Sequence, residues 1–271
     1  MNQAQLTDLI RRKASFLCVG LDPDLKKIPL YLRETEDPLF EFCKVIIDST
    51  REHCVAYKPN TAFFEALGSR GWASLEKTIS YISDTHFVIA DAKRGDLGNT
   101  AERYAEAFFS HLGVDAVTLS PYMGYDSVSP YLSYPGKWSV ILVKTSNPGS
   151  SDFQTLACGP AASTLYIEVL RKSLSWGSID NMMFVVGANN LDEFESIRNI
   201  APDHFFLVPG FGAQGGQLRD IEPYLSKNTV GILANYSRQI IYAGDGPDFG
   251  AKAGEAARRI HQEMGDMLKR L

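Results

Sequence analysis

Three ionisable residues lie close together between residues 87 and 97, and their types suit proton chemistry. Asp91, Lys93 and Asp96 follow a short apolar run, so they stand where a predicted buried strand ends. Side chains two residues apart on an extended strand point to the same face, so we expect Asp91 and Lys93 to share their surroundings. Carboxylates on either side of a lysine can keep its ammonium charged beside a reacting carbon, which the lysine can then protonate.

The same residues also allow a purely structural interpretation. Asp96 or Asn99 could cap the helix that the sequence predicts from about residue 100 to 109. Asp91 and Lys93 could form a solvated ion pair at the end of a strand. The motif alone leaves both interpretations open, and its position after a buried strand favours the chemical one.

The composition limits the classes of function. The chain has 271 residues, of which 45% are hydrophobic, so it can bury a large core as one domain if the architecture suits about 250 residues. The net charge of −5 and the pI near 5.6 argue against non-specific binding to nucleic acid. We therefore expect no nucleic-acid partner.

The cysteines and the first residues bear on location. The four cysteines are isolated in the sequence and lack the close spacing of a zinc or redox site, as in a reduced intracellular protein. Basic residues 11–13 follow the apolar positions of the first segment, whereas a secretory signal places them before. No apolar run approaches the 18 or so residues of a membrane span. We expect a cytoplasmic protein with no membrane partner.

Eight short apolar segments alternate along the chain with helical patterns or with enough residues for a helix. Near-continuous apolar strands are typical of parallel sheets, because both faces are buried. Eight such units without a break in composition predict an α/β protein with a single (β/α)8 TIM barrel domain over residues 1–271, preceded by a short N-terminal helix. The predicted strands are 15–21, 54–60, 87 to about 91, 114–119, 138–144, 182–187, 204–208 and 229–234.

A doubly wound open sheet is the alternative architecture. It would place its ligand where the strand order reverses, whereas polar residues here follow nearly every predicted strand. Between the strands, Asp37 and Pro38 have the pattern of an N-cap and a first helical residue, and they predict a helix to about residue 53. The Ser- and Gly-rich segment 150–161 is the best candidate for a mobile loop.

Polar residues at the ends of barrel strands should converge on one mouth, because parallel strands end on the same side. Lys58 stands on an apolar strand directly before a proline, which is awkward without a carboxylate partner, although its ammonium could also reach solvent. Asp22 could equally be a turn residue beside Pro23. The residues expected at the mouth are Asp22, Lys58, Asp91, Lys93, Ser146, Asn147, the segment Gly210–Gln214 and the segment Asn235–Arg238.

The last two segments have features of a phosphate site. Gly210 and Gly212 leave backbone amides open to a phosphate, and Arg238 can add a forked, charge-assisted contact. The loops after the seventh and eighth strands are the usual phosphate site of a barrel. The alternative is a glycine-rich turn without a ligand. The run is not a dinucleotide fingerprint, because it does not open a strand-turn-helix unit with a ribose-binding acid.

Together these motifs resemble the orotidine 5'-phosphate decarboxylase family, in particular its longer bacterial subgroup. The resemblance rests on the sequences DAKRGD at 91–96, TSNPG at 145–149 and PGFGAQGG at 209–216, and it extends from the first strand to Arg238. It implies the decarboxylation of orotidine 5'-monophosphate to UMP in de novo pyrimidine biosynthesis, by a carboxy-lyase that needs neither metal nor cofactor.

The resemblance also implies a role for each matching residue. Lys93 would protonate C6 of the pyrimidine, Asp91 would lie beside the substrate carboxylate, and Lys58 would hold Asp91 and the ribose. In a homodimer, Asp96 would reach the neighbouring subunit's site and Thr100 would contact ribose across the same interface. The other substrate-binding residues would be Asp22 at a ribose hydroxyl, Ser146 at the pyrimidine amide, Gln214 and Arg238 at the phosphate, and Asn147, Gly210 and Gly212.

Two other functions remain open at this stage. A magnesium-dependent sugar-phosphate decarboxylase on the same scaffold, such as 3-keto-gulonate 6-phosphate decarboxylase, has a similar motif, but Lys58 at the second strand end favours a metal-free site. A phosphate-binding barrel without catalysis would not explain a lysine placed beside two carboxylates.

Overall fold

Eight parallel strands close into a barrel in this computed structural model, which describes residues 1–82, 84–159, 162–189, 191–211 and 216–271. β1 pairs with β2 on one side and with β10 on the other, so the sheet has no edge and the open doubly wound alternative is wrong. The barrel strands are β1 (Leu17–Leu21), β2 (Ala56–Pro59), β3 (Phe87–Arg94), β4 (Ala116–Leu119), β5 (Trp138–Lys144), β8 (Met182–Val186), β9 (Phe205–Pro209) and β10 (Ile232–Tyr236).

The strands are buried on both faces, as their apolar sequences predict. The interior of the barrel is filled near the strand starts by aromatic rings that pack edge to face, with Trp138 between Phe87 and Phe205. The Trp138 indole is fully buried, and its Nε1 donates to the carbonyl of Met1 at 2.6 Å. Large rings in this layer therefore make the barrel a packed core with no pore.

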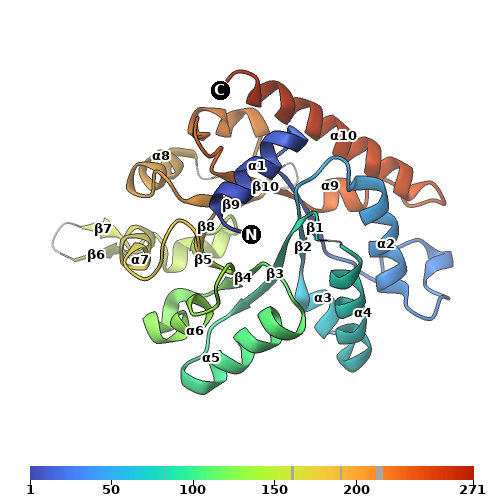
Figure 1. Ribbon diagram of the computed structural model, residues 1–271, viewed down its shortest axis with the longest axis horizontal. Coiled ribbons are helices and arrows are strands. Elements are labelled where there is room, and N and C mark those ends of the chain that lie inside the picture. The colour runs from blue at the N-terminus through green and yellow to red at the C-terminus, as the bar shows by residue number, and fades with distance from the viewer. Residues whose placement is uncertain (83, 160–161, 190, 212–215) are drawn as a thin grey trace.

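Helices surround the barrel, as Figure 1 shows. α2 begins as predicted, because the Asp37 carboxylate accepts from the Phe40 amide and Pro38 is the first helical residue. The helices are α1 (Gln3–Lys13), α2 (Pro38–Thr50), α3 (Thr61–Glu65), α4 (Gly68–Tyr81), α5 (Gly98–Ala105), α6 (Ser129–Leu132), α7 (Leu165–Leu174), α8 (Leu191–Ile200), α9 (Arg238–Ile241) and α10 (Phe249–Leu268).

Shorter turns connect these elements. Among the described residues, five are 3-10 turns, and η2 is a π-helical continuation of α5. Their bounds are η1 (Leu30–Leu32), η2 (Glu106–His111), η3 (Pro121–Met123), η4 (Tyr125–Ser127), η5 (Pro148–Asp152) and η6 (Leu218–Tyr224).

Three segments differ from the sequence prediction. The helix expected at 100–109 starts at Gly98 and passes into the π-helical turn after Ala105. The last strand begins only at Ile232, because Ser226 and Val230 exchange two backbone hydrogen bonds in a tight turn just before it. The loop predicted at 150–161 contains the end of η5 and strand β6 (Ala157–Cys158), which pairs with β7 (Ser163–Thr164), while residues 160 and 161 lie outside the described ranges.

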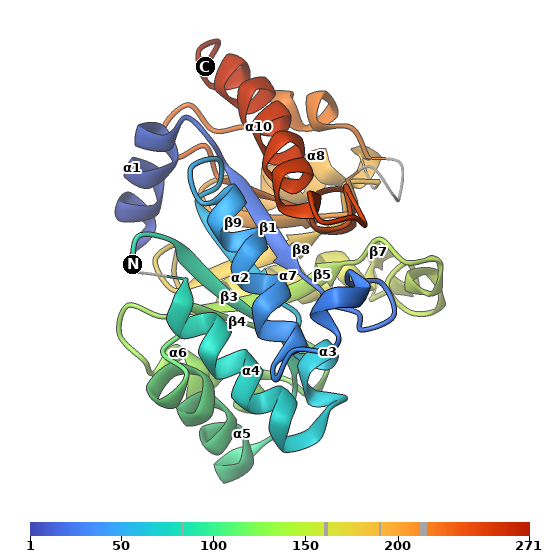
Figure 2. The same cartoon turned by 90° about the vertical axis from the view of Figure 1, so that its right-hand side faces the viewer.

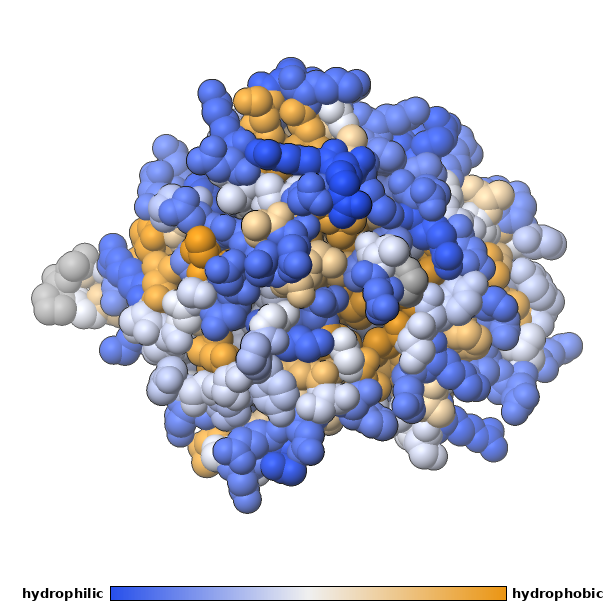
Figure 3. Space-filling model, in the orientation of Figure 1, coloured by the Kyte–Doolittle hydropathy of each residue, from blue (hydrophilic) through white to orange (hydrophobic). Residues whose placement is uncertain are grey.

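The two ends of the barrel have different covers. Figure 2 shows α1 at the end where the strands begin, and α3 and the β6–β7 hairpin toward the opposite end. The face that carries α1 is mainly hydrophilic, with apolar side chains only in small groups (Figure 3). Within the part of the chain described here, no helix has the length and apolar character needed to span a membrane. All four cysteines are free thiols.

Candidate active site

The Asp91 carboxylate lies between two lysines at the end of β3 where the strands finish. Its Oδ2 is 2.6 Å from Lys58 Nζ, and its Oδ1 is 2.6 Å from Lys93 Nζ. Asp91 and Lys58 are nearly buried, with side chains 11% and 6% exposed, whereas the Lys93 side chain is 52% exposed. The arrangement is therefore neither a solvated surface pair nor a lysine reaching out to solvent from β2.

The charges explain how a carboxylate and a lysine remain ionised in the protein interior. Burial alone would raise the pKa of Asp91, but the charges and hydrogen bonds of Lys58 and Lys93 hold that pKa well below its usual range. Burial would lower the pKa of Lys58, and the nearby carboxylates of Asp91 and Asp22 raise it above its ordinary value instead. The site thus keeps alternating charges close together, with Lys58 and Asp91 buried and Lys93 half exposed.

The backbone around Lys93 departs from a regular strand. Lys93 has a φ of +46°, in the left-handed region, and the pairing of β3 with β4 shifts register between Ala90 and Arg94. Holding a residue other than glycine in this conformation costs conformational free energy on the order of 1–2 kcal/mol. The irregularity turns Lys93 so that its ammonium reaches Asp91, and a flat strand would have left the two side chains parallel.

Thr118 on β4 completes this part of the site, and the sequence analysis did not identify it. Its hydroxyl accepts from the Lys93 amide at 2.9 Å and donates to Asp91 Oδ1 at 3.1 Å. One side chain therefore holds both the irregular backbone of Lys93 and the carboxylate. In the sequence, the available signal was a threonine among apolar residues of the predicted fourth strand. In the structure this threonine is fully buried.

Asp22 approaches the same mouth from the end of β1. Its Oδ2 accepts from the Ser237 hydroxyl, its backbone carbonyl accepts from Tyr242 Oη at 2.8 Å, and its Oδ1 is buried with no partner in the described chain. Gly20 allows this approach of β1 and β10, since a Cβ there would lie 2.9 Å from Ser237 Cβ. The free oxygen fits the expectation that Asp22 accepts from a ligand hydroxyl.

Ser146 and Asn147 follow β5 at the same end of the barrel. The Ser146 carbonyl accepts from Asn189 Nδ2 at 3.1 Å, which ties this segment to the one that follows β8. Asn147 is exposed, and its Oδ1 accepts from the Thr145 hydroxyl at 2.7 Å. Both residues therefore lie at the mouth on a loop that neighbouring side chains hold in place.

The two predicted phosphate loops begin next to each other. β9 and β10 are paired, with Pro209 opposite Asn235, and the rings of Phe211 and Tyr236 stack with centroids 4.9 Å apart. Gly210 has a φ of +103°, which a residue with a side chain would rarely adopt. Arg238 is exposed at the start of α9. The predicted residues Gly212 and Gln214 lie outside the described ranges.

Asp96 and Thr100 do not join the Asp91 cluster within this chain. Asp96 is half-buried and accepts from the amide of its neighbour Leu97 at 2.8 Å, and Thr100 is exposed on α5. Leu97 precedes the first residue of α5, and no side chain caps that helix, so neither Asp96 nor Asn99 has the capping role that the sequence allowed.

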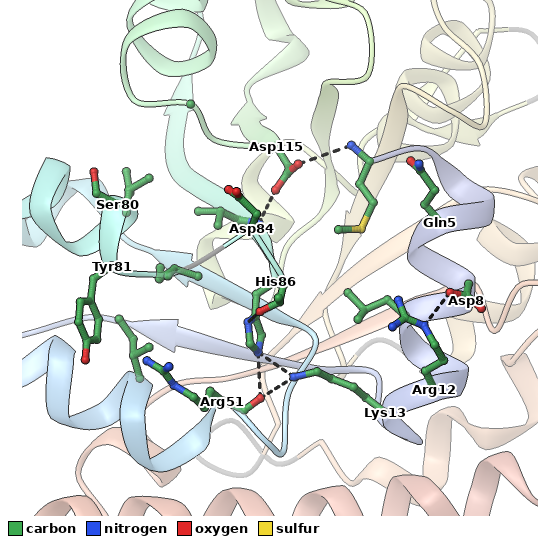
Figure 4. Close-up of a pocket in the computed structure, with 18 of the residues that line it drawn as sticks. Gln5, Asp8, Arg12, Lys13, Arg51, Ser80, Tyr81, Asp84, His86 and Asp115 are labelled. Atoms are coloured by element: carbon green, nitrogen blue, oxygen red, sulfur yellow. Dashed lines mark hydrogen bonds and ion pairs between the residues drawn. The ribbon is translucent and has the colours of Figure 1, made fainter.

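A cavity of about 1440 Å³ lies at the opposite end of the barrel, where the strands begin (Figure 4). Its polar groups bind one another: Lys13 Nζ donates to the Arg51 carbonyl at 2.6 Å and lies 2.9 Å from His86 Nε2. Asp115 accepts from the Val88 amide at 2.9 Å. This cavity is far from the strand ends that carry Asp91, and we do not take it as the active site.

The site holds no group of metal ligands in the part of the chain that the structure describes. There, no three His, Cys, Asp or Glu side chains come together in a way that could hold a metal ion. The chemistry that this arrangement supports is proton transfer and electrostatic stabilisation by Lys93, Lys58 and Asp91.

Residues 15–252 match the model of the orotidine 5'-phosphate decarboxylase / HUMPS family. The chain belongs to this family. A decarboxylase relative from Phocaeicola vulgatus is 52% identical over 267 residues, which cover 97% of this chain and 98% of that protein. All elements of the site described above fall inside the matched region, including the Asp91 cluster, Asp22 and Arg238.

Solved structures of orotidine 5'-phosphate decarboxylases have the same fold. The Leishmania donovani OMP decarboxylase is similar with a TM-score of 0.82 and 36% identity, and 99% of each chain is covered. Leishmania donovani UMP synthase is similar with a TM-score of 0.80 and 40% identity, over 94% of this chain and 56% of that longer one. This chain therefore spans just over half of the synthase and the whole of the decarboxylase.

Proposed function

We propose how this chain carries out the reaction of its family, the decarboxylation of orotidine 5'-monophosphate to UMP in pyrimidine biosynthesis. The observation that carries the mechanism is the Asp91 carboxylate held between Lys58 and Lys93. The bond from C6 to the carboxylate breaks, carbon dioxide leaves, and the electron pair stays on C6. Lys93 then gives a proton from Nζ to C6 and recovers one from water.

Fixed charges supply the stabilisation that this carbanion needs. The pyrimidine ring delocalises charge at C6 poorly, so an ammonium already placed beside it lowers the barrier most. Lys93 suits this role because its side chain is half exposed toward the mouth while its ammonium is held by Asp91. Lys58 is buried and holds the other oxygen of Asp91, so it acts as the fixed support of the pair.

The rest of the mouth binds the nucleotide. The unpartnered Oδ1 of Asp22 accepts a ribose hydroxyl, Ser146 binds the pyrimidine, and Asn147 binds an oxygen of the nucleotide. Arg238 and the amides after β9, together with Gln214, bind the phosphate. Phosphate binding far from C6 supplies energy that organises the reacting groups, so the loops after β9 and β10 contribute to the rate as well as to affinity.

The active unit is a homodimer in which Asp96 and Thr100 complete the partner's site. Both residues lie away from the Asp91 cluster of their own chain, beside exposed apolar side chains. Leu97 is 50% exposed, and Tyr122 after β4 is 87% exposed. The Ser120 amide donates to the Arg94 carbonyl at 2.8 Å, so the two exposed segments start side by side and form one surface for a second copy.

We also propose that the enzyme works in the cytoplasm without a metal or another cofactor. Lys58 occupies the second strand end, and its ammonium repels a cation there, which favours a metal-free site. The sugar-phosphate alternative therefore predicts magnesium dependence, whereas the mechanism proposed here does not.

The test is the loss of orotidine 5'-monophosphate absorbance in excess EDTA, with wild type, Lys93→Ala and Lys252→Ala measured in parallel. We expect full turnover in EDTA for wild type and for Lys252→Ala, whose lysine lies on α10, pairs with Asp248 and has no contact with the Asp91 cluster in the described chain. We expect Lys93→Ala to lose at least about 10³-fold in kcat, because it removes both the fixed charge and the proton donor.

Two outcomes would contradict the proposal. Turnover that requires magnesium would favour the sugar-phosphate chemistry. A folded protein that binds UMP but converts no substrate would leave a phosphate-binding barrel without catalysis.

A further inference from the structure

Gln154 makes two hydrogen bonds to Thr145, one with each end of its side-chain amide. Its Oε1 accepts from the Thr145 backbone amide at 2.9 Å, and its Nε2 donates to the Thr145 hydroxyl at 2.8 Å. Thr145 is the first residue after β5, and Gln154 lies nine positions further along, beyond η5. Two bonds from one amide fix both the backbone and the side chain of Thr145.

This contact sets the direction of the next hydrogen bond. A backbone amide can only donate, so the Gln154 atom beside it must be the oxygen, and the atom at the Thr145 hydroxyl must be the donating nitrogen. The Thr145 hydroxyl therefore accepts from Gln154 and sends its own proton onward. That proton goes to Asn147 Oδ1, 2.7 Å away.

The consequence for Asn147 is a fixed amide orientation. Because its Oδ1 accepts from Thr145, the other side of the amide presents the two N–H donors of Nδ2. Asn147 is exposed at the mouth, so these donors can meet an oxygen acceptor of a bound nucleotide. Without the hydrogen bonds from Gln154 to Thr145 and from Thr145 to Asn147, the Asn147 amide could turn over. It would then present its oxygen, which a carbonyl or phosphate oxygen would repel.

Gln154 is itself well anchored. Its backbone amide donates to the Ser150 carbonyl at 2.9 Å, and its carbonyl accepts from the Tyr166 amide at 3.0 Å, at the start of α7. The buried Lys144 ammonium at the end of β5 also donates to the Ser150 hydroxyl at 3.3 Å. The side chain that orients Thr145 is thus attached to a helix of the barrel wall.

We propose that Gln154 is a positioning residue which, through Thr145, holds the Asn147 amide with its N–H donors toward an oxygen acceptor of the bound nucleotide. This rests on the proposed function, in which Asn147 belongs to the substrate-binding mouth. Gln154 does not touch the substrate. It fixes the direction in which hydrogen bonds are donated along the relay from Gln154 to Thr145 to Asn147.

Gln154→Glu tests this direction with almost no change in shape. The glutamate keeps an oxygen for the Thr145 amide, but its second oxygen cannot donate, so the Thr145 hydroxyl must turn its proton toward residue 154. We expect UMP affinity and 1/KM to fall about five- to tenfold, the effect of roughly one hydrogen bond, with kcat and the unfolding midpoint close to wild type.

A double-mutant cycle with Asn147→Ala separates positioning from a general effect on the loop. If Gln154 acts through Asn147, Gln154→Glu should weaken UMP binding in the wild-type background and have no further effect in Asn147→Ala. Thr145→Val, which keeps the backbone amide but removes the hydroxyl, should match Gln154→Glu, and Thr145→Ser should restore wild-type affinity.

The outcomes distinguish this inference from the proposed function. Full affinity in Gln154→Glu, or losses that simply add in the double mutant, would overturn the relay while Asn147 keeps its role. An Asn147→Ala variant with wild-type KM would overturn the binding role of Asn147 itself, and the relay with it. Titration with ribose 5-phosphate assigns the acceptor: weakening for UMP alone indicates the pyrimidine, and weakening for both indicates the sugar phosphate.

Discussion

At the scale of single residues, the site depends on buried charges that compensate one another. Lys58 and Asp91 are each nearly inaccessible, and each keeps its charge because the other is 2.6 Å away. Removing one partner of such a pair leaves an uncompensated charge in the interior, which costs more than the pair contributes. We therefore expect Lys58 to contribute more to stability than Lys93, which is the proposed proton donor.

Lys58→Met should lower the free energy of unfolding by about 3 kcal/mol, because Asp91 then keeps only the exposed Lys93 as a partner. Lys93→Met should lower it by less than about 1 kcal/mol, since the Lys93 side chain is half exposed. Urea unfolding followed by circular dichroism measures both. Equal losses for the two variants would show that burial does not separate their roles.

His86 makes the stability of the fold depend on pH, independently of the Asp91 cluster. It is 6% exposed, and burial lowers its pKa to about 4, against about 6.5 in the unfolded chain. Between these values the unfolded state binds the proton and the folded state does not, so stability falls as pH decreases from about 6.5 to 4. Above pH 7 the imidazole is neutral in both states and contributes no pH dependence.

Replacing His86 by Gln should therefore flatten the stability profile. From pH 7 to 5 the wild type should lose about 1–2 kcal/mol more than His86→Gln, because only the wild type takes up a proton at residue 86 on unfolding. His204, whose pKa burial also lowers to about 4, contributes equally to both proteins. Buried carboxylates such as Asp91 do not disturb this window, since their pKa values are held low and their contribution is lost only at more acidic pH. Parallel slopes for the two proteins would contradict the assignment.

At the scale of elements, Arg198 joins the end of α8 to the starts of two strands. Its guanidinium donates to the His204 carbonyl at 2.7 Å and to the Gly231 carbonyl at 2.9 Å, and it lies 3.7 Å from the Phe206 ring centroid. Burial lowers its pKa to about 10. A planar cation with several donors can satisfy carbonyls just before β9 and β10 at once.

Arg198→Lys should destabilise the fold by about 2 kcal/mol, because an ammonium cannot span both carbonyls or stack on the ring. Arg259→Lys on the exposed face of α10 is the matched control and should cost less than about 0.5 kcal/mol. Thermal unfolding provides the measurement, with kcat unchanged in both variants. A stable Arg198→Lys protein would show that this connection is dispensable.

At the scale of the whole molecule, a second copy decides whether the proposed site is complete. The Asp96 carboxylate accepts from the Leu97 amide and lies in no ion pair of the described chain, although the same DAKRGD motif contains Lys93, the proposed proton donor. A closed twofold dimer would bring the same exposed segments of both copies together, so each subunit would supply Asp96 to the other. The monomer alone would then hold Lys93 without its second carboxylate.

Mixing two inactive variants tests this arrangement. Lys93→Ala and Asp96→Ala should each be inactive alone, because every site lacks one group. After subunit exchange, half of the dimers are hybrids with one intact site, so activity should return to about a quarter of the wild-type level. A mixture that stays inactive, while exchange is shown by mass spectrometry of intact dimers, would place Asp96 in its own subunit's site.

The amino-acid sequence by itself predicted the barrel, and it indicated the residues that we propose for its chemistry. Continuous apolar strands are a local pattern that predicts a parallel sheet covered on both faces. Polar residues after nearly every strand favoured the closed barrel over an open sheet. Asp91, Lys93 and Asp96 were visible for the same reason, since their spacing lies within one segment.

Only the tertiary structure decided which polar and charged groups form pairs with one another. Lys58 and Asp91 are 33 residues apart and meet because β2 and β3 are neighbours in the sheet. Ser237 and Asp22 are 215 apart and meet because the barrel closes between β10 and β1. No local pattern records either pairing. The left-handed backbone of Lys93 and the grip of Gln154 on Thr145 arise where strands end and regular hydrogen bonding stops. There, side chains from distant segments replace the missing backbone partners, and only the folded chain brings them together.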